Sequence, residues 1–200
     1  MNEARSMELI DYAHRLAALR LCGGKDVLAA RASDGRILLL CGADFANASP
    51  EQVKLLSLAD AAAREQACAL FAARPDVQGL ALLSSPFSTR LSREGKAMRA
   101  SLDDTAQIAG GRIRCAASSA QTDALPALKR NFGCFVKNEG MLTIGRTLHE
   151  AFVAALVLEK GARAELEARP FGGAVPLSAF DCALMRRVYL KKYSQIQERA

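Results

Sequence analysis

The sequence has no tryptophan, and aromatic side chains make up only 6% of its 200 residues. A core without large rings must consist mainly of Leu, Ala, Val and Ile. No stretch approaches the roughly eighteen apolar residues that a helical membrane span needs. The first ten residues are acidic and amphipathic, which is not the pattern of a secretory signal. We therefore expect a cytoplasmic protein that does not enter a membrane.

Histidine is equally scarce, because the chain contains only His14 and His149. Three imidazoles therefore cannot meet at one metal within a single chain. The six cysteines form no C-x-x-C pair, and their spacing is not that of a zinc ribbon. Most of them lie in apolar runs, which favours reduced, buried thiols.

The net charge of +6 comes from residues that are scattered along the chain and never form a run of five. A solvated basic surface is the first interpretation, and a basic pocket for an anionic small molecule is the second. Nucleic-acid binding ranks last. The nearest approach to a basic patch lies on an expected C-terminal helix, at Arg186, Arg187, Lys191 and Lys192.

The length favours one domain over residues 1–200, with 177–200 as a C-terminal helical extension. Hydrophobic periodicity predicts helices at 3–22, 58–73, 102–109, 122–131, 148–167 and 177–197. Shorter apolar runs predict strands at 27–30, 37–41, 77–83, 112–116, 134–137 and 141–144. Asp34-Gly35 indicates a hairpin turn, and Ser49-Pro50 and Pro86 indicate helix starts. Strands and helices do not alternate strictly, which favours a sheet with antiparallel pairs covered by helices.

Five short motifs follow one another along the chain: Arg74-Pro75-Asp76-Val77, Ser85-Pro86, Asn138-Glu139-Gly140, Glu150-Ala151-Phe152 and Tyr189–Tyr193. In their order and spacing they resemble the class II aldolase/adducin family, which includes fuculose-phosphate aldolases and ribulose-phosphate 4-epimerases. The resemblance implies a three-layer α/β/α fold whose central sheet is mixed and largely antiparallel. It also implies a homo-oligomer, with a tetramer as the common form.

The same resemblance exposes a conflict at the family's zinc site. The three ligand histidines fall on Leu82, Ser84 and Glu139. A leucine cannot ligate, and a neutral hydroxyl is a poor zinc ligand. We therefore expect no zinc cofactor.

Two further parts of the family's site are also altered. The acid–base carboxylate falls near Ala63. Glu65, two residues on, would be turned by about 200° on a continuous helix and so would point elsewhere. The family's phosphate-binding turn falls at Asp26-Val27, where a carboxylate would repel phosphate.

A pocket could nevertheless remain at these positions. Its predicted ligand-binding residues are Asp26, Cys41, Gly42, Ser84, Ser85 and Asn138, with Glu139 as the one catalytic candidate. Glu139 and Asp26 would face each other across the former metal site and bind a cation or a polyol. The plainer alternatives are strand-end caps for the two serines, a turn residue for Glu139 and a buried thiol for Cys41.

The leading hypothesis is a class II aldolase/adducin-like protein that has lost the zinc site and is non-catalytic or binds a small ligand, either a polyol or a sugar phosphate. The alternative is an active sugar-phosphate aldolase or epimerase, a carbon–carbon lyase type of enzyme, with a rebuilt site that uses Glu139. Fold alone does not decide between them.

Overall fold

The computed structural model describes residues 2–42 and 44–197, with side chains for 3–42 and 44–191. The α-helices are α1 Asn2–Ala18, α2 Leu58–Arg64, α3 Leu70–Ala73, α4 Pro86–Ser92, α5 Gln121–Leu128, α6 Leu148–Ala168 and α7 Ala179–Gln197. The strands are β1 Val27–Arg31, β2 Ile37–Cys41, β3 Lys54–Leu56, β4 Gly79–Leu83, β5 Met98–Arg99, β6 Arg112–Ile113, β7 Cys115–Ala116, β8 Gly133–Val136 and β9 Gly140–Gly145.

The main sheet has the strand order β3-β2-β1-β4-β9-β8-β7. Only the β7–β8 pair is parallel, so the predicted mixed and largely antiparallel sheet is confirmed. The two predicted hairpins join β1 to β2 and β8 to β9. Each turn uses positive φ angles, at Gly35 (83°) in the first and at Asn138 (64°) and Gly140 (127°) in the second.

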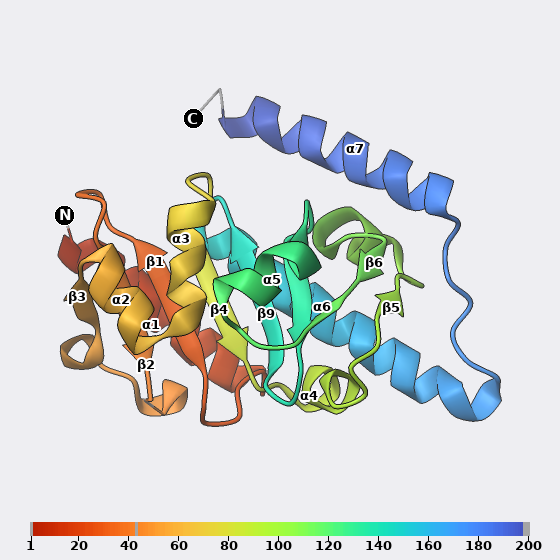
Figure 1. The fold of residues 1–200 in the computed structure, drawn as a ribbon, viewed down its shortest axis with the longest axis horizontal. Coiled ribbons are helices and arrows are strands. Elements are labelled where there is room, and N and C mark those ends of the chain that lie inside the picture. The colour runs from red at the N-terminus through yellow and green to blue at the C-terminus, as the bar shows by residue number, and fades with distance from the viewer. Residues whose placement is uncertain (1, 43, 198–200) are drawn as a thin grey trace.

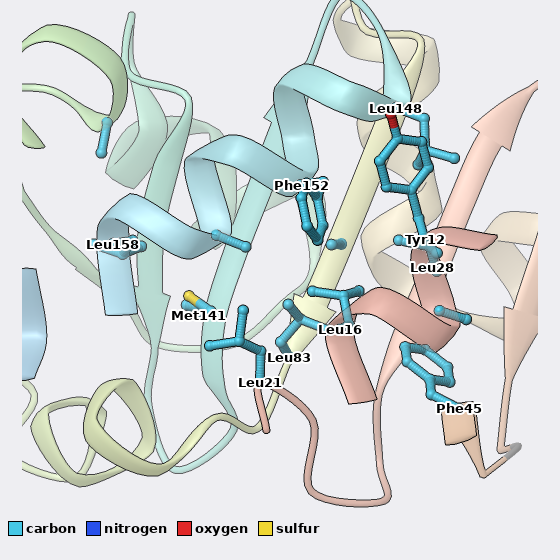
Figure 2. Close-up of a cluster of buried hydrophobic side chains, with 14 of the residues drawn as sticks. Tyr12, Leu16, Leu21, Leu28, Phe45, Leu83, Met141, Leu148, Phe152 and Leu158 are labelled. Carbon is cyan, nitrogen blue, oxygen red and sulfur yellow. The ribbon is translucent and has the colours of Figure 1, made fainter. Parts of the chain in front are cut away.

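Helices cover both faces of this sheet, as Figure 1 shows. One face packs against α1, α4 and α6, and the other packs against α2, α3 and α5. Alternate strand residues divide between the two faces, with Leu28 and Leu83 on the first and Val27 and Leu82 on the second. Figure 2 shows the first cluster, in which Leu16, Leu83 and Phe152 come from three different elements. None of the described helices combines the length and hydropathy that a membrane crossing requires.

The predicted helix at 58–73 is not continuous, and this is the difference that matters most for the site. Glu65 has φ −140° and ψ 110°, which is extended backbone and ends α2. The chain then continues through a 3-10 turn at Gln66–Ala69 into α3. The local apolar periodicity is the same for one helix as for two, so it could not reveal this break.

Three smaller differences concern short elements. Pro50–Gln52 is a single 3-10 turn, and it leads into the unpredicted edge strand β3. Residues 105–109 form one π-helical turn that ends at Gly110. The run 112–116 divides between two sheets, because β6 pairs with β5 while β7 pairs with β8.

A buried carboxylate fixes the segment that follows β4. Glu159 of α6 is 7% exposed and accepts hydrogen bonds from the Ser85 hydroxyl (2.8 Å), Phe87 N (2.7 Å) and Ser88 N (2.8 Å). These N–H groups belong to the first turn of α4, which has no partners of its own for them. Glu159 therefore caps α4 from another helix and sets the position of residues 84–89.

Candidate functional site

The antiparallel register brings three separate segments together at one end of the central strands β1, β4 and β9. Leu82 of β4 lies opposite Val27 of β1 on one side and Leu142 of β9 on the other. The end of β4 therefore meets the loop before β1 and the turn before β9. Gly140 makes the second approach possible, because any Cβ there would collide with the Leu83 carbonyl oxygen.

Asp26 joins the first two of these segments. Its Oδ2 accepts hydrogen bonds from Gly23 N and Gly24 N, both at 2.8 Å. Its Oδ1 accepts from Ser84 N at 2.8 Å and from the Ser84 hydroxyl at 2.9 Å. The side chain is 2% exposed, so all four donors reach it from within the protein. Asp26 is therefore a clamp between the loop and the strand end. We predicted that it would face Glu139, but its carboxylate is directed at the loop and at Ser84 instead.

A cavity of about 520 Å³ opens beside this clamp. It is lined by Gly23, Lys25, Glu65, Leu82, Ser84, Thr89, Asn138 and Glu139. The structure thus brings together three of the predicted site residues: Ser84, Asn138 and Glu139. The volume of the cavity is in the range of small-molecule binding sites.

The other predicted residues do not line this cavity. Ser85 is fully buried and directs its hydroxyl to Glu159, because the chain turns into α4 immediately after Ser84. Cys41 and Gly42 come at the end of β2, which is separated from β4 by β1. Asp26 lies beneath the cavity wall, as described above.

Glu65 is a functional candidate that sequence reasoning rejected, and the rejection was wrong. The argument assumed a continuous helix, but α2 ends at Arg64 and the extended backbone of Glu65 turns its side chain into the cavity. Burial raises the pKa of the Glu65 carboxyl above its ordinary value, and the negative charge of Glu139 adds to the rise. A hydrogen bond from the Ala67 backbone lowers the pKa of Glu65 and so offsets part of this rise.

Thr89 contributes a further polar atom that the sequence did not point to. Its Oγ1 is shielded from solvent and, within the described residues, has no hydrogen-bond partner. An unpaired buried hydroxyl costs about 1–3 kcal/mol.

The residues at the zinc positions do not fit a three-histidine centre. Leu82 is 5% exposed and presents only carbon, and the Ser84 hydroxyl is already donated to Asp26. Within the described ranges no three His, Cys, Asp or Glu side chains cluster so that they could hold a metal ion. His14 and His149 are engaged elsewhere, with the Ala48 carbonyl and the Tyr12 hydroxyl, each at 3.0 Å.

Comparisons with known proteins agree with this architecture. The family model described as "Class II Aldolase and Adducin N-terminal domain" matches residues 29–166. The chain belongs to the class II aldolase and adducin family. The resemblance inferred from the sequence motifs is therefore confirmed.

Solved structures show the same fold over almost the whole chain. An L-fuculose 1-phosphate aldolase matches with a TM-score of 0.80 and 20% identity, covering 92% of this chain and 95% of its own. The L-fuculose 1-phosphate aldolase of Glaciozyma antarctica PI12 has a TM-score of 0.79 and 19% identity, over 91% and 80% of the two chains. YgbL of Escherichia coli, a putative aldolase/epimerase/decarboxylase, has a TM-score of 0.74 and 19% identity, over 92% and 98%. No curated protein matches the sequence.

The Asp26 clamp can be tested by stability. In Asp26→Asn an amide NH₂ replaces one acceptor oxygen and faces N–H or O–H donors, so the free energy of unfolding should fall by about 2–4 kcal/mol. The matched control is Asp11→Asn, which removes an exposed ion pair with Arg15 and should cost about 0.5 kcal/mol or less. Urea unfolding measures both, and equal stabilities of the two variants would contradict the clamp.

Proposed function

We propose that this protein binds a small uncharged polyol in the cavity beside Asp26 and does not carry out zinc-dependent aldolase chemistry. The observation that carries the proposal is the cavity lining itself. Leu82 stands where the resemblance implies a zinc ligand, and the carboxylates of Glu65 and Glu139 stand nearby. Membership of the family accounts for the fold, and the side chains of Leu82, Glu65 and Glu139 are the basis for proposing a polyol as the ligand.

The polar atoms of the cavity suit hydroxyl groups. Glu65 and Glu139 offer carboxylate acceptors, and Lys25 offers an ammonium donor. A polyol can satisfy all of these groups at once, because each hydroxyl is both donor and acceptor.

A phosphorylated ligand fits this cavity less well. Two carboxylates repel a phosphate dianion, and one lysine does not outweigh them. The N–H groups of Gly23 and Gly24 would otherwise be available to an external anion, but the Asp26 carboxylate already accepts both. The Asp26 carboxylate thus occupies the position that an external anion would take in that loop. Of the two ligands predicted from the sequence, the polyol is therefore favoured over the sugar phosphate.

Calorimetry with ribitol and ribitol 5-phosphate tests this preference, since polyols of about four to six carbons suit a cavity of this size. Ribitol should bind at least about tenfold more tightly than its phosphate. Glu139→Gln should weaken ribitol binding by about tenfold, because a charged acceptor becomes a neutral one. Thr89→Val should raise the stability of the free protein by about 1 kcal/mol, because it removes an unpaired buried hydroxyl.

The control for these variants is Glu167→Gln, which alters an exposed α6 residue paired with Arg163. Its binding should equal that of the wild type. Tighter binding of the phosphate, or equal binding by Glu139→Gln and the control, would overturn the proposal.

A second function rests on the altered pKa of Glu65. Burial raises the pKa of Glu65, so this carboxyl keeps its proton to a higher pH than an ordinary Glu and is the candidate acid, with Glu139 as the candidate base of an epimerase or a carbon–carbon lyase with a rebuilt site. Turnover should then fall as pH rises through the raised pKa of Glu65.

A panel of sugars and sugar phosphates tests that alternative. It predicts turnover that Glu139→Gln and Glu65→Gln both abolish and that Glu167→Gln leaves unchanged. Absence of turnover across the panel, or activity that survives both substitutions, would remove the alternative.

A homo-oligomer also remains our expectation, with a tetramer as the common form. Phe180, Leu184 and Val188 lie one helical turn apart on α7 and are 74%, 51% and 58% exposed. An apolar stripe of this kind is suited to contact with another copy of the chain.

A further inference from the structure

A second cavity, of about 540 Å³, lies between α7 and the two-stranded ribbon of β5 and β6. Three arginines line it: Arg99 of β5, Arg112 of β6 and Arg186 of α7. Its lining also includes the Asn131 amide, and no Asp or Glu is among the residues that form its walls. We call it the arginine cavity. In Figure 1, α7 runs past the part of the molecule that carries β5 and β6.

Two of these arginines stand directly opposite each other. Arg99 and Arg112 are partners in the antiparallel register of β5 and β6, which places their Cβ atoms about 5 Å apart. Like charges opposite each other on a ribbon are destabilising. Among the described residues neither forms an ion pair, and Arg99 donates to the Leu177 carbonyl at 3.5 Å. Within the described residues, no ion pair therefore offsets the repulsion between Arg99 and Arg112.

The third arginine is held in place by the protein. The Arg186 guanidinium donates to the carbonyl oxygens of Gln107, Ile108 and Arg130, and it lies 4.4 Å from the centroid of the Phe132 ring. Burial lowers the pKa of Arg186 to about 10, so the group remains a cation at neutral pH.

Two carboxylates lie in the electrostatic neighbourhood of these arginines. Asp181, at the start of α7, accepts the Ser178 hydroxyl at 2.6 Å and keeps its negative charge, which acts on Cys182 together with the charge of Arg99. Glu150 acts on Arg186 and is paired with Arg146 at 3.0 Å. The three arginines therefore outnumber these two carboxylates.

The geometry points to a binding site for a small oxyanion that carries at least two negative charges, held by Arg99 and Arg112 together and attracted by Arg186. Guanidinium forks bind carboxylate and phosphate oxygens in pairs, and one such anion would neutralise both opposed arginines. The volume suits a small molecule. Arg186, which we expected in a basic patch on α7, is directed at backbone carbonyls of the protein, and the side chain of Lys192 from the same expected patch lies outside the described residues.

An anion in this cavity would also secure α7. Its ligands would come from α7 on one side and from the ribbon on the other. Binding should therefore slow amide hydrogen exchange in residues 179–191, while exchange in α1 should stay unchanged.

Calorimetry in low salt with inorganic phosphate, inorganic pyrophosphate and citrate tests the site, and comparison of the last two distinguishes phosphate from carboxylate chemistry. One equivalent of at least one of these anions should bind to the wild type. The double variant Arg99→Gln/Arg112→Gln should bind it about tenfold more weakly or worse. The charge-matched control Arg90→Gln/Arg93→Gln, in the last turn and at the C-cap of α4, should bind as the wild type does.

The melting temperature of the same double variant, Arg99→Gln/Arg112→Gln, provides a second test. Without anion it should melt at or above the temperature of the wild type, because two opposed charges are removed. With anion the wild type alone should gain stability. No binding by the wild type, or equal loss of binding in both double variants, would overturn the site. The polyol proposal does not depend on this result, since it concerns another cavity.

Discussion

The buried carboxylate of Asp26 is the contact on which the candidate site depends. One side chain accepts four hydrogen bonds, two from the loop before β1 and two from Ser84 at the end of β4. It holds the loop so close to the strand that a Cβ on Gly23 would lie 2.7 Å from the Ser84 carbonyl oxygen. The cavity wall is therefore fixed before any ligand arrives, and the anion-binding capacity of the loop is already taken up.

A family fold can retain its cavity while the groups inside it change. The register of β1, β4 and β9 still brings the same three segments together, because it depends on backbone pairing and on the two apolar layers. What lines the cavity depends on single side chains, and here they are an aliphatic Leu82, the carboxylates of Glu65 and Glu139, and an unpaired hydroxyl at Thr89. This set contains no imidazole, unlike the three-histidine zinc site that the resemblance implied.

The sequence predicted the sheet and its hairpins because these follow from local signals. Asp34-Gly35 and Asn138-Glu139-Gly140 impose turns, and short continuous apolar runs mark the strands on either side of them, which are buried on both faces. Ser84, Asn138 and Glu139 were predicted from the family resemblance, because they fall at or beside the ligand positions of its motifs. Glu65, Thr89 and the clamp role of Asp26 were missed, since each depends on where the chain breaks or on partners that are distant in the sequence. The burial of Ser85 against Glu159 involves residues 74 positions apart.

The most direct test of the account is the metal content of the purified protein, measured by elemental analysis after growth with zinc and dialysis. The wild type is predicted to hold well under one transition-metal ion per chain. The variant Leu82→His/Ser84→His/Glu139→His, which restores imidazoles at the three positions, serves as the comparison and is predicted to bind zinc more tightly than the wild type. One tightly bound zinc per chain in the wild type would contradict the account.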